Sequence, residues 1–99
     1  MQKINLPKQL FEKDPTLDVE YNGSYGYGYT YKDKIKFVLW VSNHVSIKFV
    51  LTDKMKEVMN FEEQRTYFRY IILVEEGTKI ATNEIKKLEE LCEYLYEKF

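Results

Sequence analysis

The chain carries one histidine, His44, and one cysteine, Cys92, so the side chains that most often act as nucleophile, general base or soft metal ligand are scarce. His44 falls in a predicted hairpin turn, and no nucleophile or carboxylate stands near it at a catalytic spacing. Cys92 lies between Leu88 and Leu95 on an apolar helical stripe, where a thiol stays neutral and inert. One histidine and one cysteine also give no metal-ligand spacing. We therefore predict no enzyme, no catalytic residue, no metal site and no cofactor.

Carboxylates are plentiful, and three of them stack at i,i+4 spacing along the predicted C-terminal helix: Glu89, Glu93 and Glu97. Like charges at this spacing cost a helix a few tenths of a kcal/mol per pair. One interpretation is a solvated surface. The other is an acidic ridge that binds a basic partner or mimics a phosphate backbone.

A run of alternating tyrosines is the most unusual feature, and lysines follow it directly: Tyr25, Tyr27, Tyr29, Tyr31, Lys32, Lys34 and Lys36. On a strand these four rings share one face, with Gly26 and Gly28 between them. Aromatic rings beside basic residues can stack single-stranded nucleic acid, at about 1–3 kcal/mol per base. The alternative is that the rings are buried and form core.

The turn after the tyrosines decides between these interpretations, because a one-residue slip moves every side chain to the other face. A two-residue loop at Asp33-Lys34 places Tyr29 opposite Val38, on the expected core face. A three-residue loop at 32–34 places Tyr29 opposite Phe37, on the second face, where a ligand, a partner or a second copy can reach it. The sequence leaves both registers open.

The clearest element is a hairpin of residues 35–42 and 45–51, for which Asn43-His44 fits a two-residue loop. The first face, expected to be core, pairs Trp40 with Ile47 and Val38 with Phe49; the second, mixed but apolar, pairs Leu39 with Lys48 and Phe37 with Val50.

Further periodic segments surround this hairpin. We predict a short helix from Pro7 to before Pro15, strands at 17–22, 25–31 and 66–75, a helix capped near Thr52, and a long amphipathic helix capped by Thr82. The long helix carries the stripe Ile85, Leu88, Leu91, Cys92, Leu95 and Phe99. The fold class is therefore α+β: one domain over residues 1–99, with an antiparallel sheet of four to five strands, a long C-terminal amphipathic helix and one or two shorter helices.

Charge and hydropathy exclude some partners. The net charge of −1 gives no global attraction for nucleic acid or anionic lipid. No apolar run approaches a membrane span, no secretory core follows the start, and a single cysteine does not require an oxidising compartment. We expect a cytoplasmic protein with no membrane partner and no small-molecule substrate.

Tyr, Phe, Ile, Lys and Asn together supply 40 of the 99 residues, whereas Ala81 is the one alanine. The enriched residues have AT-rich codons. In this bias over the whole chain, the protein resembles the small accessory proteins of AT-rich phages and archaeal viruses. The resemblance implies host takeover, anti-defence or genome handling, and a location in the host cell cytoplasm.

Two functions follow as hypotheses. The first is a non-enzymatic protein-interaction module of unknown partner, a viral inhibitor that forms a homodimer, because the strands 35–42 and 66–75 are apolar on both faces and need cover. The alternative is a single-stranded nucleic-acid binder that uses the tyrosine ladder on the sheet face.

Overall fold

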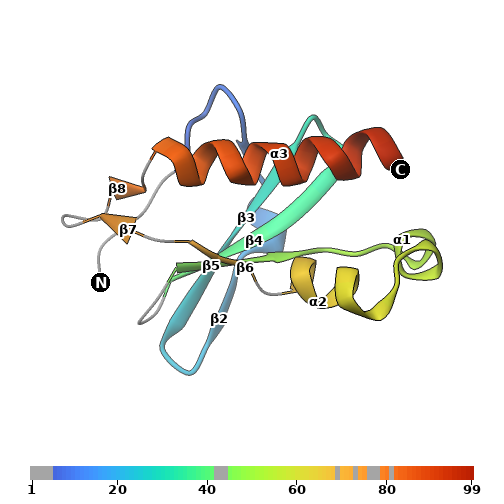
Figure 1. The fold of residues 1–99 in the computed structure, drawn as a ribbon. Coiled ribbons are helices and arrows are strands. Elements are labelled where there is room, and N and C mark those ends of the chain that lie inside the picture. Colours follow the sequence, from blue (N-terminus) through green and yellow to red (C-terminus); the bar gives the residue numbers. More distant parts are fainter. Residues whose placement is uncertain (1–5, 42–44, 69, 73, 76–78, 81) are drawn as a thin grey trace.

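The computed structural model describes residues 6–41, 45–68, 70–72, 74–75, 79–80 and 82–99. Its elements in chain order are β1 (Glu12–Lys13), the 3-10 helix η1 (Pro15–Leu17), β2 (Val19–Tyr21), β3 (Ser24–Tyr31), β4 (Ile35–Val41), β5 (Val45–Phe49), α1 (Asp53–Val58), α2 (Phe61–Phe68), β6 (Tyr70–Ile72), β7 (Val74–Glu75), β8 (Lys79–Ile80) and α3 (Thr82–Lys98) (Figure 1).

The main sheet is antiparallel and runs in the order β1-β3-β4-β5-β6, with β2 also paired to β3. The strands β7 and β8 form a separate two-stranded ribbon. The sheet and the long C-terminal helix α3 confirm the predicted α+β class.

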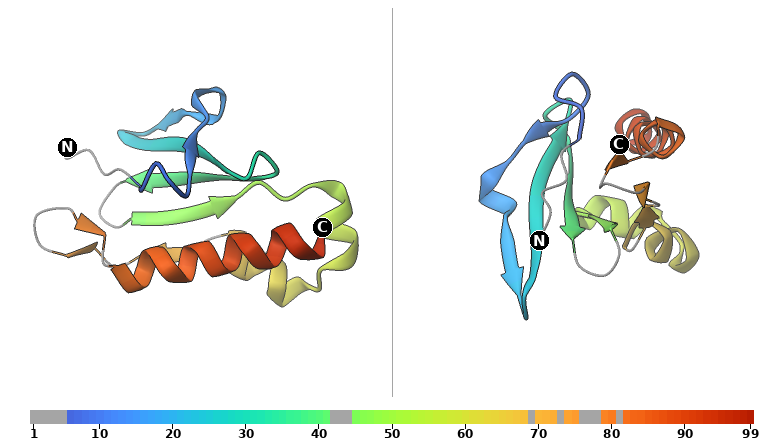
Figure 2. Two further views of the ribbon diagram at one scale, coloured as in Figure 1. Left: turned by 90° about the horizontal axis from the view of Figure 1, so that it is seen from above. Right: turned by 90° about the vertical axis from the view of Figure 1, so that its left-hand side faces the viewer.

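The three α-helices lie on one side of the main sheet, to the right of its strands in the right-hand panel of Figure 2. Helix α3 packs against β4, and α2 packs against β5. The opposite side carries no α-helix within the described residues, and the 3-10 helix η1 covers one part of it against β3. We call this opposite side the open face.

The turn between β3 and β4 has three residues, 32–34. Lys32 and Asp33 take positive φ angles of 50° and 57°, and the Lys34 amide donates to the Tyr31 carbonyl over 3.1 Å. Tyr29 therefore lies opposite Phe37. This is the second of the two registers that the sequence left open.

The predicted register of the next hairpin is wrong by one residue. Phe37 pairs with Phe49 and Leu39 with Ile47, whereas Trp40 pairs with Ser46 and Val38 with Lys48. The residues of the predicted loop, Asn43 and His44, lie outside the described part, but the register leaves three residues, 42–44, between the strands.

The shift exchanges the two faces of this hairpin. Residues directly opposite in a sheet share a face, so the odd-numbered residues of β3, β4 and β5 lie together under the helices. Phe37, Leu39 and Ile47 are fully buried there, because this register gathers the large apolar side chains of both strands on one side. Trp40 and Val38, expected in the core, lie on the open face instead.

The predicted strand 17–22 is shorter than expected, because η1 interrupts the sheet edge between β1 and β2. The Asp14 amide donates to the Gly28 carbonyl, and the Gly28 amide donates to Asp18 Oδ1, each over 2.8 Å. A Cβ at Gly28 would lie 2.2 Å from the Asp14 carbonyl oxygen. Glycine thus lets η1 cross β3 closely, which removes Leu17 from the strand.

The predicted strand 66–75 is also wrong in its first part, because residues 66–68 belong to α2. The strand β6 begins at Tyr70, and β7 holds residues 74–75. The Asn60 side chain caps α2, and its Oδ1 accepts from the Glu63 amide over 2.8 Å. This cap starts a helix that extends into the first three residues of the predicted strand.

The helix near Thr52 is confirmed as α1, with Thr52 Oγ1 accepting from the Met55 amide. Met55 and Met59 are buried, but Val58, expected beside them, is 54% exposed. At the N-terminal end, the predicted helix is a single turn in which the Leu10 and Phe11 amides donate to the Pro7 carbonyl.

The long helix α3 spans Thr82–Lys98 and buries the predicted stripe. Leu88, Cys92 and Leu95 are essentially inaccessible to solvent, and Ile85, Leu91 and Phe99 pack at the margin of the core. The core thus lies between α3 and the helix-covered face of the sheet.

Candidate functional site

The tyrosine ladder belongs largely to the core. Tyr29 and Tyr31 are 1% and 4% exposed, and Tyr27 packs against the core from its margin. Tyr29 stacks on Phe37 with a centroid separation of 5.7 Å. Tyr25, at the far end, is 38% exposed. The second register does not expose Tyr29 and Tyr31, because the face it selects is the one that the helices cover, so these two rings offer no stacking surface.

The lysines after the ladder tie the β3–β4 turn to its surroundings. Lys32 Nζ lies 2.9 Å from Glu93 Oε2 and 4.9 Å from the Tyr96 ring centroid. Lys34 Nζ donates to the Tyr96 carbonyl. Lys36 Nζ, on the open face, pairs with Asp14 Oδ2 at 3.2 Å. These cations are exposed, but each already has a partner in the fold.

Glu93, the central residue of the predicted acidic ridge, points to the end of β3. Its Oε2 accepts from the Tyr31 hydroxyl and from Lys32 Nζ, and these bonds hold the pKa of Glu93 below its ordinary value. Burial raises the pKa of Tyr31, and the bond to Glu93 adds to this. Glu93 therefore bonds to the end of β3 at the edge of the core. Its carboxylate does not extend from the helix surface as the middle of a ridge between Glu89 and Glu97.

The remaining reactive groups take structural positions. Cys92 is fully buried, and burial raises the pKa of its thiol well above the ordinary value, so the thiol stays protonated. His44 lies outside the described residues. Among the residues that the structure describes, no three His, Cys, Asp or Glu side chains are placed to hold a metal ion.

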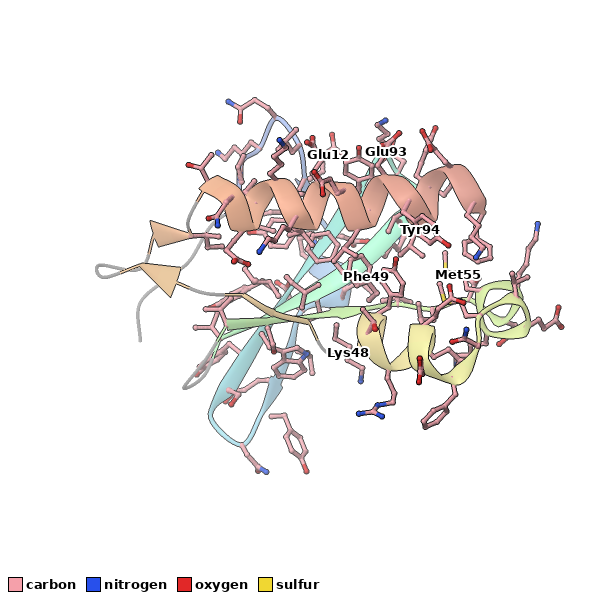
Figure 3. The ribbon with its side chains drawn as sticks, in the orientation of Figure 1. Glu12, Lys48, Phe49, Met55, Glu93 and Tyr94 are labelled. Atoms are coloured by element: carbon pink, nitrogen blue, oxygen red, sulfur yellow. The ribbon has the colours of Figure 1, made fainter. Side chains whose placement is uncertain are left out.

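A groove of about 480 Å³ lies between α2 and α3. It is lined by Glu63, Thr66, Tyr67, Lys87, Glu90, Leu91 and Tyr94. The lining residues of α2 are spaced i, i+3 and i+4, and those of α3 extend over two turns, so one face of each helix forms a wall. Figure 3 shows Tyr94 on the side of α3 that faces α2.

The apolar part of the groove is fixed by the core. Tyr67 is 6% exposed and packs edge-on against Phe49 with a centroid separation of 5.3 Å. Burial raises the pKa of Tyr67 to about 12, and the nearby Glu63 carboxylate adds to this. Tyr94 is 45% exposed, so its ring forms an open aromatic surface beside a rigid floor.

The α2 wall is anchored by a reciprocal cap. The Asn60 amide donates to Glu63 Oε1 over 3.5 Å, while the Glu63 amide donates to Asn60 Oδ1. Gln64 Nε2 donates to the Met59 carbonyl and connects α2 to the end of α1. The cap leaves Glu63 Oε2 directed to α3.

A cation occupies one end of the groove. Lys98 Nζ lies 3.6 Å from Glu63 Oε2 and 5.2 Å from the Tyr94 ring centroid, and it donates to the Tyr94 hydroxyl over 2.9 Å. The bond to Tyr94 raises the pKa of Lys98 above its ordinary value. A carboxylate and an aromatic ring thus form a receptor for an ammonium group.

The charges along the rest of the groove are unequal. Lys87 pairs with the buried Glu84 at 3.8 Å. Glu90 is exposed and makes no ion pair within the described residues. The middle of the groove therefore presents an apolar floor and an acidic rim.

Sequence reasoning placed none of the groove residues in a site, because it assigned Tyr67 to a strand. The available signal was the Asn-x-x-Glu spacing at Asn60 and Glu63, which is typical of a reciprocal helix cap. With a helix at 61–68, the i+4 neighbours Glu63 and Tyr67 share a face.

Comparisons with known proteins add no assignment: no family model, no curated protein and no solved structure matches this chain. Among the described residues, no helix has both the length and the apolar character needed to cross a membrane.

Proposed function

We propose that this protein is a non-enzymatic protein-interaction module that binds a basic, amphipathic segment of a partner protein in the groove between α2 and α3. The observation that carries the proposal is the position of the Lys98 ammonium group, which lies against Glu63 and Tyr94. Lys98 thus shows how the groove would bind a lysine or arginine side chain of a partner.

The apolar floor supports a peptide as the ligand. Leu91 and the Tyr67 and Tyr94 rings offer contact to apolar side chains, and Glu90 offers a charge for the next lysine or arginine. An amphipathic helix binds such a groove through apolar side chains at positions i, i+3 and i+4. A volume of about 480 Å³ accommodates a few side chains, which suits a short segment.

The wider surface has the same sign. On α2 and α3, the carboxylates at the surface, which are Glu62, Glu63, Glu89, Glu90, Glu93 and Glu97, outnumber the cations Arg65, Lys86, Lys87 and Lys98. This excess favours the approach of a basic partner and disfavours a nucleic-acid backbone. The compositional resemblance to viral accessory proteins makes inhibition of a host protein the corresponding biological role, in the host cytoplasm.

A peptide pair tests the proposal. We expect a short peptide of leucine and lysine, patterned as an amphipathic helix, to bind in calorimetry, whereas the matched peptide with glutamate in place of lysine does not. Tyr94→Ala and Glu90→Lys should each weaken binding by about tenfold or more, equivalent to about 1.4 kcal/mol. Lys98→Ala should strengthen binding, because it removes the ammonium group that competes with the peptide for Glu63.

Phe61→Ala is the matched control, because Phe61 is an exposed aromatic residue of α2 that does not line the groove. It should leave the affinity unchanged. Equal binding of the two peptides, or an affinity insensitive to Tyr94→Ala, would contradict the proposal.

A further inference from the structure

The open face of the sheet carries an uncharged patch that the groove does not involve. By the strand register, Val19, Trp40 and Ser46 form one row across this face, and Tyr21 and Ser24 form the next. Tyr21 is 69% exposed, Val19 is 42% exposed and Trp40 is half-buried. We call these five residues the aromatic patch. Exposed clusters of large apolar side chains typically mark an interaction surface.

The floor of the aromatic patch is preformed. A Cβ placed on Gly26 would lie 2.6 Å from the Val38 side chain, 2.8 Å from that of Val19 and 3.3 Å from the Trp40 ring. These three side chains therefore pack directly on the backbone of β3. A ligand meets a ring whose position is already fixed, which lowers the entropy that binding costs.

The charged side chains of the open face that flank the patch already have partners. Lys48, one row away, has an interaction within the fold, and Asp18 accepts from a backbone amide of β3. Lys36 lies a further row away and pairs with Asp14. Glu12 shares that row, which η1 separates from the patch where it crosses β3. The patch is therefore electrically neutral, and it offers no free opposite charge to a nucleic acid or an ionic peptide.

The polar groups of the patch can all donate hydrogen bonds. The Trp40 indole offers an N–H group and no acceptor, while Tyr21, Ser24 and Ser46 offer hydroxyl groups. Within the part of the chain that the structure describes, none of these side chains bonds to another group. The matching ligand is therefore uncharged and apolar, with carbonyl oxygens that are free to accept.

We infer that the aromatic patch binds a proline-rich segment of a partner protein in the polyproline II conformation. Proline has no amide N–H, and the polyproline II helix has no internal hydrogen bonds, so such a segment presents apolar rings and free carbonyl oxygens. The rings pack on Trp40 and Tyr21, and the carbonyls accept from the indole N–H and the hydroxyl groups. Aromatic-lined surfaces bind such segments in several unrelated domains.

The extent of the patch suits a short segment better than a second copy of the chain. The row from Val19 to Ser46 crosses the strands β2, β3, β4 and β5, and spacings of about 4.8 Å make it about 14 Å long. A polyproline II helix rises about 3.1 Å per residue, so about five residues span this row. A standard protein–protein interface needs about 800 Å² of accessible surface per partner, which is more than the patch offers.

Titration of the full chain with a blocked oligoproline peptide tests the inference. The emission of Trp40, the single tryptophan, should shift to shorter wavelength in a saturable way, because the proline rings remove the indole from water. A glycine–serine peptide of the same length should cause no shift. The affinity should be the same at low and high salt, since no charges take part, whereas the binding of a charged ligand weakens with salt.

Calorimetry with variants locates the binding surface. Tyr21→Ala should raise the dissociation constant of the peptide at least about tenfold, because it removes the most exposed ring of the patch. Trp40→Phe, which keeps a ring but removes the indole N–H, should weaken binding by a smaller factor. Phe61→Ala, which alters a similarly exposed aromatic residue of α2, should leave the affinity unchanged. Circular dichroism of each variant separates loss of binding from loss of the fold.

The inference is overturned if oligoproline causes no saturable shift, if the glycine–serine peptide binds equally well, or if Tyr21→Ala leaves the affinity unchanged. Sedimentation velocity adds a further test, because a dimer of the 12.0 kDa chain that Tyr21→Ala dissociates would assign the patch to a second copy instead. The patch and the groove lie on opposite sides of the sheet, so failure of the basic peptide to bind the groove leaves this inference standing, and the reverse also holds.

Discussion

Several side chains that resemble functional groups serve the fold. Glu93 accepts from Tyr31 and Lys32 at the point where β3 ends beneath α3. Lys34 donates to a carbonyl of the same helix. A half-buried carboxylate that receives a phenol hydroxyl and an ammonium group joins two segments that lie 62 residues apart. The polar residues of the predicted sites therefore attach the β3–β4 turn to α3.

Glu93 makes stability depend on acid. Its pKa is lowered in the folded protein, so its contribution is present above the ordinary value of 4.5 and is lost as the pH falls through the lower, folded value. Glu93→Gln should therefore destabilise the protein at neutral pH, and the difference from wild type should shrink on acidification. Urea denaturation at pH values on both sides of this window measures it. Glu89→Gln is the control, and an equal effect there would contradict the role of Glu93.

The elements are set by caps and glycines as much as by hydrophobic pattern. Asn60 caps a helix that runs on to Phe68, into the first residues of the segment predicted as a strand. Gly28 admits η1 to within contact of β3, which divides the sheet edge into β1 and β2. Each of these single residues determines the course of a whole element.

The cap of α2 can be tested directly. Asn60→Ala should lower the free energy of unfolding by about 0.5–2 kcal/mol, because the Glu63 amide loses its acceptor. Asn60→Asp and Asn60→Ser, which retain an accepting oxygen, should preserve most of the stability. Chemical denaturation followed by circular dichroism measures the differences. A variant with alanine as stable as wild type would show that the cap does not hold α2.

The whole molecule has two layers, with helices on one side of the sheet and the open face on the other (Figure 2). Phe49 and Tyr67 connect α2 to the sheet, and Leu88 and Leu95 bring α3 onto the same core. One core shared by every major element is the expectation for a single folding unit.

A single unit predicts a single transition. Trp40 emission reports on the open face, while far-ultraviolet circular dichroism reports chiefly on α3, at the other side of the sheet. In urea, the two signals should change at the same concentration with the same steepness. Separate midpoints on the same samples would show that the helical layer and the sheet unfold independently.

The sequence by itself determined the local elements. Alternation defined β3, a nearly continuous apolar run defined β4, and the apolar stripe with Thr82 at its start defined α3, because hydrophobic period and capping depend on near neighbours in the chain. The inertness of Cys92 also followed from that stripe.

Tertiary structure alone decided which face of the sheet is covered. The spacing of Tyr29 and Tyr31 is the same whether the rings are buried or exposed, and a shift of one residue between β4 and β5 exchanged Trp40 for Phe37 in the core. Pairing register and helix placement arise from contacts far apart in the chain, which a local pattern does not encode. For the same reason, the groove between α2 and α3 exists only where two distant helices meet.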